Sequence, residues 1–294
     1  MKFKRLFLGA SLVFLLSSCT IRLPWQKSDS NNSSQTSQQG SQSGGSSGGQ
    51  SSGGTTSSTE LPPDVNTYYA SISDSLTGTE LRTALNTLNN QKKKKEVTYA
   101  GFRTFAAKSD IDPTSGSNKI VGFYDNSLVG PGWDGGSTWN REHMWPNSLG
   151  GGKVEDDAHM VRPASTSINS ERGNKYFGSS GSTYDPGQYV ANYRGISARI
   201  IFYCAIADTS LNIIDANSGG SNQMGKLSDL LRWNLQYLPG TSTTELRVEQ
   251  NRNEVIQKDS AGQGNRNPFI DHPEYACKIW GNTNSETKSI CGLN

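Results

Sequence analysis

The stretch "STWNREHMWPNS", residues 137–148, decides how the rest of the sequence is interpreted. Glu142 and His143 are neighbours in it, and Pro146 follows shortly after them. We predict a short strand over Trp139–Trp145. Neighbouring side chains of a strand point to opposite faces, but the pleat breaks where a strand ends at a proline. The carboxylate and the imidazole can therefore reach one cavity.

A carboxylate beside an imidazole suits two separate chemical tasks. Carboxylate oxygens are ligands of hard divalent cations such as Mg²⁺. An imidazole that is neutral near pH 7 can take a proton from water. Together the two groups indicate metal-assisted hydrolysis of a phosphodiester. An isolated Glu-His pair is more often a surface glutamate beside a structural histidine, so this interpretation depends on the rest of the sequence.

Other kinds of catalytic site have less support in the sequence. The chain has three histidines, His143, His159 and His272, and none belongs to an HxH, HxxxH or HExxH pair. A zinc site of three histidines would use all of them and leave no general base. Residues 61–294 contain no GxSxG motif, which argues against a serine hydrolase. A zinc hydrolase that uses His143, His159 and Asp157 remains as a weaker alternative.

The first residues have the composition of a targeting segment. A basic start precedes the apolar run Leu6–Leu16, which has the length of a signal-peptide core and is short for a membrane span. The sequence Leu16–Cys19 resembles a bacterial lipobox. We therefore expect residues 1–19 to be a lipoprotein signal peptide with Cys19 as the lipidated residue. The alternative is an ordinary secretory signal with a chance cysteine.

Residues 20–60 are expected to form a flexible linker, because they are rich in Ser, Gly, Gln, Thr and Asn. Residues 61–294 then form the folded domain. Residues 1–60 carry five basic and two acidic side chains, so a net charge of +2 for the chain leaves −1 for the domain. A near-neutral domain argues mildly against tight DNA binding, since that affinity depends mainly on neutralising phosphates.

Hydrophobic periodicity predicts several elements of the domain. A helix with Thr79 as N-cap carries Leu81, Leu85 and Leu88. The glycine-rich residues 128–138 form a loop near the substrate. The remaining predicted elements are strands within 97–110 and 119–126, a helix that begins near Ser165, a buried helix over 198–208, and helices over 228–238 and 243–259.

The cysteines give partial information. Cys204 lies in an apolar run and is predicted to be buried. Cys277 and Cys291 are 14 residues apart and could pair outside the cytoplasm. The sequence leaves that pairing open.

Three motifs occur together: "WNREHMWPNS", "DDAHMVRPASTSINSERGN" and "GQGNRNPFIDHPEY". In this order they closely resemble the endonuclease I family, secreted or periplasmic non-specific nucleases of the ββα-metal (His-Me finger) superfamily. The resemblance extends from "YYASISDSLTG" through "NPFIDHPEY". It implies an α+β fold, a mainly helical body around a ββα-metal (His-Me) finger with short antiparallel strands.

The resemblance also implies roles for single residues. His143 would be the general base, and Glu142 and Asn169 would hold one divalent ion, Mg²⁺ first, with Mn²⁺ or Ca²⁺ as alternatives. Arg162 and Arg172 would clamp phosphate. A salt bridge on a helix surface is the alternative for Arg172.

Other residues match supporting positions of the family. Arg141, Asn265 and Arg266 are expected to contact the substrate. Asp157 and His159 are expected to orient the groups that contact the metal and the substrate. We assign no role to His272.

The expected function is therefore a lipid-anchored, extracytoplasmic, metal-dependent endonuclease that acts as a monomer. Its substrate would be DNA, with RNA as a second candidate, and its products would carry 5′-phosphates. The alternative is a non-catalytic, lipid-anchored surface binding protein or adhesin. Glu142, His143 and Asn169 argue against this alternative, because a binder has no chemical need for that set.

Overall fold

A computed structural model describes residues 63–293 of the chain. The predicted signal peptide, the lipidated Cys19 and the linker over 20–60 lie outside the described residues. Residues Leu61–Asn294 form one unit by their internal contacts. Among the described helices, none is long and apolar enough to cross a membrane.

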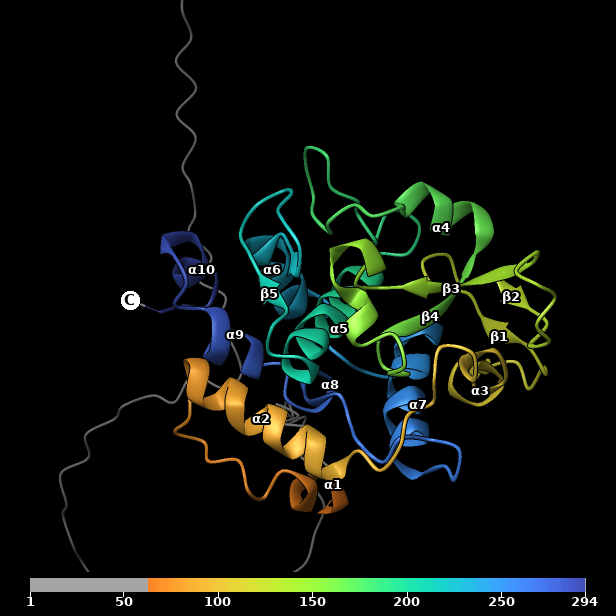
Figure 1. Cartoon of the computed structure of the whole chain (residues 1–294), viewed down its shortest axis with the longest axis horizontal. Helices are drawn as coiled ribbons and strands as arrows, with labels where there is room; N and C mark the ends of the chain where they lie inside the picture. The colour runs from red at the N-terminus through yellow and green to blue at the C-terminus, as the bar shows by residue number, and fades with distance from the viewer. Residues whose placement is uncertain (1–62, 294) are drawn as a thin grey trace, which may run out of the picture. The chain divides into compact units, whose positions relative to one another are not determined.

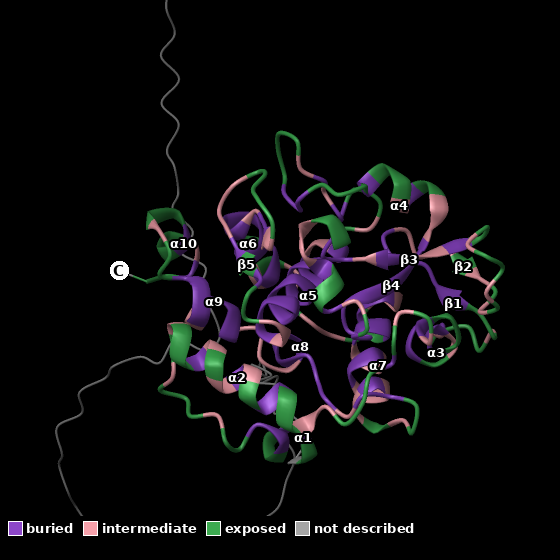
Figure 2. Ribbon diagram, in the orientation of Figure 1, coloured by how far each residue is buried: buried purple, intermediate pink, exposed green. Residues whose placement is uncertain are grey.

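Helix α5, Tyr193–Ala207, is the centre of the domain (Figure 1). All but two of its residues are buried, as its apolar sequence predicts, and Figure 2 shows it almost entirely as buried. Its most extensive helix contacts are with α2 (Gly78–Lys92), α6 (Leu227–Gln236), α7 (Thr244–Lys258) and α8 (Pro268–Asp271). The short helix α1, Pro63–Tyr68, completes the amino-terminal part.

The strands form three pairs in the described part of the chain. In the pair that matters for the site, β3 (Trp139–His143) and β4 (Val161–Ser165) are antiparallel, with Glu142 opposite Arg162. Helix α4 (Thr166–Arg172) follows β4 directly and packs on both strands (Figure 1). The other pairs are antiparallel β1–β2, Ile120–Val121 with Leu128–Val129, and parallel β5–β6, Asn212–Ile213 with Gln223–Met224.

These elements confirm the α+β class. The helix predicted to begin near Ser165 is α4, and the Ser165 hydroxyl caps it by accepting a hydrogen bond from the Ile168 amide at 3.3 Å. The connection from β3 to β4 contains two short 3₁₀ turns, η1 (Asn147–Leu149) and η2 (Gly151–Lys153). The sequence order is therefore strand, turn-rich connection, strand and helix.

The strand predicted within residues 97–110 is wrong. Phe102–Ser109 is helix α3, and its buried residues are Phe102, Phe105, Ala106 and Ser109. These positions recur at helical spacing, and α3 packs against α7 with them. The predicted cap of α2 is also displaced, since the N-cap residue is Thr77 and not Thr79.

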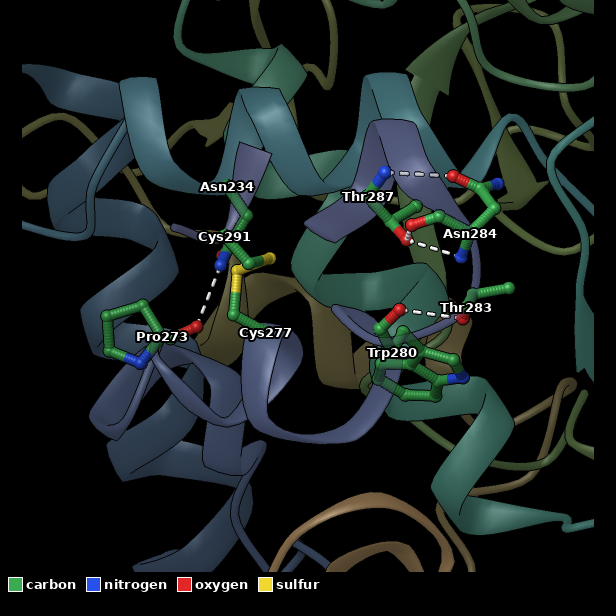
Figure 3. Close-up of a disulfide and its surroundings, with 8 residues drawn as sticks. All are labelled: Asn234, Pro273, Cys277, Trp280, Thr283, Asn284, Thr287 and Cys291. Atoms are coloured by element: carbon green, nitrogen blue, oxygen red, sulfur yellow. Dashed lines mark hydrogen bonds between the residues drawn. A yellow bond between two sulfur atoms is a disulfide. The ribbon is translucent and has the colours of Figure 1, made fainter. Parts of the chain in front are cut away.

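The carboxyl-terminal segment is fixed to the core by covalent and aromatic contacts (Figure 3). A disulfide joins Cys277 of α9 (Tyr275–Trp280) to Cys291, directly after α10 (Ser285–Ile290). Trp280 stacks on Phe202 of α5 at 4.9 Å between ring centroids. The sequence left this pairing open. Cys204 is buried, as predicted.

Candidate active site

A cavity of about 420 Å³ lies beside the end of β3. Its walls come from the loop before α3, the glycine-rich loop before β3, β3 itself, and α4 with the turn that follows it. Glu142, His143 and Asn169 all line this cavity, although Asn169 is distant from the other two in the sequence. Arg141 and Arg172 line it as well.

Glu142 is a buried carboxylate with a 2% exposed surface. The Tyr124 hydroxyl donates a hydrogen bond to its Oε1 at 2.8 Å, and a terminal nitrogen of Arg172 lies 3.2 Å from the same atom. Burial raises the pKa of Glu142, and Arg172 and the Tyr124 hydrogen bond oppose that rise. Within the described residues Oε2 accepts no hydrogen bond, so it remains available to a further cation.

Asn169 lies in the middle of α4 and is half-buried. Its side-chain amide makes no hydrogen bond within residues 63–293. An amide oxygen and a carboxylate oxygen at one cavity are ligands that Mg²⁺ accepts, with water and phosphate oxygens in the remaining positions. The described residues contain no group of three or more His, Cys, Asp or Glu side chains able to hold a metal. The donor set of Glu142 and Asn169 thus fits one hard divalent ion.

His143 is half-buried beside the ring of Tyr99, with 4.5 Å between the ring centroids. Its Nε2 lies 3.4 Å from Oε2 of Glu155. Burial lowers the pKa of His143, and the Glu155 carboxylate works against this by favouring the charged form. The imidazole is therefore neutral near pH 7 and can accept a proton.

Glu155 contacts His143 without being part of the cavity lining, and our sequence predictions do not include it. It lies in the connection between β3 and β4, and the Asn147 amide donates a hydrogen bond to its Oε2 at 3.0 Å. The run of acids in "VEDDAH" is the only sequence signal for it. Which of those acids reaches His143 depends on how the connection folds back over the end of β3.

Arg172 lines the cavity, which is compatible with its predicted contact with phosphate, but its alternative role is wrong. It is 1% exposed, so it forms no salt bridge on a helix surface. Its terminal nitrogens donate hydrogen bonds to the carbonyl oxygens of His143 at 2.8 Å and Met144 at 2.6 Å. The guanidinium also lies over the ring of Phe177 at 4.7 Å. Arg172 reaches the cavity, but its main contacts join α4 to the end of β3.

The structure does not place Arg162, Asn265 and Arg266 in this cavity. All three are buried, and their polar groups contact other parts of the protein. Arg162 lies 3.3 Å from an Asp110 carboxylate oxygen, and Arg266 donates two hydrogen bonds to Asp271 at 2.8 Å.

The side chain of Asn265 belongs to an interior polar network. Its amide donates hydrogen bonds at 2.7 Å to Asn89 and to the Tyr203 hydroxyl. The cavity is formed without this side chain and without those of Arg162 and Arg266.

Asp157 and His159 belong to the same interior network and not to the cavity lining. Tyr203 donates a hydrogen bond to Asp157 at 2.7 Å, and Lys93 lies 3.1 Å from the same carboxylate oxygen. His159 packs on the Tyr203 ring at 4.6 Å between centroids, and burial lowers the pKa of His159 to about 4. The alternative zinc site is not assembled, because neither residue shares the cavity with His143.

His272 also lies outside the cavity lining. Its ring stacks on Tyr275 with 4.6 Å between centroids, and its Nδ1 lies 3.0 Å from a Glu274 carboxylate oxygen. These contacts are structural.

Comparison with known proteins identifies the family. The family model for endonuclease I matches residues 77–274. This chain belongs to the endonuclease I family. The matched region contains the whole cavity lining and all three sequence motifs up to "NPFIDHPE".

Two extracellular ribonucleases are similar to this chain over most of their length. An extracellular ribonuclease of Bacillus amyloliquefaciens is 37% identical over 251 residues, which are 76% of this chain and 82% of the relative. An extracellular ribonuclease of Bacillus subtilis (strain 168) is 34% identical over 241 residues, 74% of this chain and 79% of the relative. No solved structure matches the chain.

The buried His159 predicts a pH-dependent stability. An unfolded histidine titrates near pH 6.5, whereas His159 in the folded state has a pKa of about 4. Between these values only the unfolded chain binds the proton, so the free energy of unfolding falls as the pH is lowered from about 6.5 to 4. The expected contribution is roughly 3 kcal/mol. His159→Gln removes it.

Urea unfolding of the wild type and of His159→Gln at pH 7 and pH 4.5 measures this effect. The wild type should lose more stability on acidification than the variant, because all other titrating groups are shared. Equal losses in the two proteins would assign the acid sensitivity to other groups.

Proposed function

We propose that this protein is an extracytoplasmic endonuclease that hydrolyses phosphodiester bonds of RNA or DNA, with His143 as general base and one divalent cation held by Glu142 and Asn169. The observation that supports this most directly is the shared cavity of these three side chains in a member of the endonuclease I family. In this proposal β3, β4 and α4 are the ββα-metal finger.

His143 supplies the proton acceptor. Its lowered pKa keeps the ring neutral, so it takes a proton from a water molecule, which then attacks the phosphorus atom. Glu155 faces Nε2, and Tyr99 packs against the ring. These two contacts fix the orientation of the imidazole, and the carboxylate stabilises the imidazolium that forms.

Glu142 and Asn169 supply the oxygen atoms for the cation, for which Mg²⁺ is our first candidate and Mn²⁺ or Ca²⁺ the alternatives. When bound, such an ion offsets the negative charge that develops on the phosphate and on the leaving oxygen. Tyr124 and Arg172 both contact Oε1 of Glu142 and fix the carboxylate in position. The expected products carry 5′-phosphate and 3′-hydroxyl ends.

RNA becomes the first candidate substrate and DNA the second. The sequence motifs alone favoured DNA, but both relatives with assigned names are extracellular ribonucleases. No feature of the described residues specifically supports the alternative of a non-catalytic adhesin. An adhesin would not need a neutral, half-buried imidazole beside a buried carboxylate in one cavity.

His143→Ala is expected to lower kcat by ~10²–10⁴ with little change in KM, because it removes the proton acceptor and leaves the binding groups in place. Cleavage of a fluorescent RNA oligonucleotide and nicking of plasmid DNA measure it. His272→Gln is the matched control, since His272 packs on Tyr275 outside the cavity. A His143→Ala enzyme as active as the control would remove His143 from the mechanism.

Glu142→Gln and Asn169→Ala are expected to raise the Mg²⁺ concentration that gives half-maximal activity, because each removes one ligand oxygen or its charge. Thermal unfolding provides a second readout. Mg²⁺ should raise the Tm of the wild type and of His143→Ala, but not of the two ligand variants. Unchanged Mg²⁺ titrations in both assays would show that the ion binds elsewhere.

We further propose that Cys19 is lipidated and anchors the enzyme to the outer face of the cell membrane. Full-length protein should then be recovered with the membrane fraction, and Cys19→Ser should move it to the soluble or secreted fraction. Retention of the variant in the membrane pellet would contradict the lipid anchor.

A further inference from the structure

A layered row of planar side chains lies along one side of the cavity. The ring of Tyr99 packs against His143, and the guanidinium of Arg141 lies 3.6 Å from the centroid of the Tyr99 ring. Arg141 also lies over Trp133 at 5.0 Å, and Arg103 lies over Trp133 at 5.2 Å. The row thus connects the imidazole of His143 with α3 through alternating aromatic rings and cations.

Trp133 has a fixed position in the glycine-rich loop between β2 and β3. Its ring meets the buried Trp139 edge to face, with 5.0 Å between centroids. The neighbouring Asp134 closes the loop by accepting hydrogen bonds from the amides of Ser137 and Thr138, both at 2.9 Å. Trp133 is half-buried and lines the cavity, so part of its surface faces the cavity.

The two arginines of the row have no carboxylate within ion-pair distance in the described part of the chain. Neither Arg103 nor Arg141 forms an ion pair within residues 63–293. Arg141 donates one hydrogen bond, to the Tyr99 carbonyl at 2.6 Å, and its buried Nε has no partner in the described residues. The buried Arg199, by contrast, is paired with Glu249. The unpaired charge therefore lies next to an aromatic surface at the cavity.

We propose that Trp133, supported by Arg141 and Arg103, is a stacking site for one unpaired base of the substrate, and that the enzyme therefore prefers single-stranded nucleic acid. This inference rests on the proposed nuclease function. An aromatic ring beside a cation suits a nucleotide, because the ring stacks on the base and the cation attracts the phosphate. Bases within a double helix have both faces covered by their neighbours and cannot stack on a protein ring.

The charge of the domain favours the same conclusion. Binding to a duplex relies mainly on the neutralisation of many phosphates, but residues 61–294 have a net charge of −1. Stacking of an unpaired base contributes ~1–3 kcal/mol for each base without requiring a basic surface. The charge of the domain attracts a nucleic-acid strand only weakly. Stacking of one base at the cavity can thus supply part of the binding energy.

Three kinds of substrate test the stacking site. The first is a fluorescent single strand with one phosphodiester flanked by nuclease-resistant linkages. The second is the same strand annealed to its complement, and the third carries an abasic sugar, placed in turn on each side of the cleavable bond. The wild type should cleave the base-bearing single strand with a kcat/KM ~10-fold above the duplex and above one of the abasic strands.

Trp133→Ala should reduce both ratios to less than ~2, because the variant cannot distinguish a strand that offers a base from one that does not. Trp133→Phe should restore a large part of the discrimination, since phenylalanine keeps a ring for stacking. Circular dichroism and Tm of both variants check that the loop change leaves the fold intact.

An equal loss of kcat/KM on all substrates in Trp133→Ala, or unchanged ratios, would overturn the stacking site while the nuclease function stands. A wild type that cleaves single strand and duplex equally would overturn it as well. If the wild type cleaves none of the substrates in the presence of Mg²⁺, the proposed function itself fails, and the inference fails with it.

Discussion

The geometry of the candidate site depends on the contacts of one buried guanidinium, that of Arg172. This last residue of α4 contacts three successive residues of the chain, at Glu142 Oε1 and at the carbonyl oxygens of His143 and Met144. Asn169 lies one helical turn earlier in the same helix. The guanidinium therefore fixes the strand that carries the carboxylate and the imidazole against the helix that carries the amide. Loss of one partner of such a buried pair costs about 3–5 kcal/mol, because the other charge is left without compensation.

The environment of each reactive group suits a different protonation state. Glu142 is buried, which raises its pKa, but Tyr124 and Arg172 stabilise the charged form through one of its oxygens. The second oxygen has no protein donor in the described part of the chain, and the proposed cation would complete its stabilisation. His143 is also desolvated, and for an imidazole the same effect favours the neutral form. Glu142 and His143 are neighbours in the sequence, and their surroundings suit a carboxylate that binds a cation and an imidazole that accepts a proton.

Local pattern was sufficient to predict several elements of the fold. The buried helix α5, the helices α6 and α7, the strand β3 and the start of α4 near Ser165 were all predicted from the sequence. Helix α3 was not, because its aromatic residues also suit a strand and only packing on α7 selects the helix. The site shows the same division. Glu142 and His143 were predicted because they are neighbours in the sequence, and Asn169 was predicted from a family motif. Glu155 and Trp133 were not predicted, because they lie in loops whose path depends on tertiary contacts.

The arginines show why sequence could not identify the residues at the substrate. A basic residue in a motif can serve the substrate or neutralise an interior carboxylate, and only its neighbours in space decide. Arg162 lies beside Asp110, a carboxylate that it shares with Arg252, and Arg266 is bonded to Asp271, so both charges face carboxylates inside the fold. The positive charge left at the cavity is that of Arg141 on Tyr99 and Trp133. With so little free charge at the site, the proposed stacking of a base on Trp133 would add affinity that contacts to the phosphates alone do not supply.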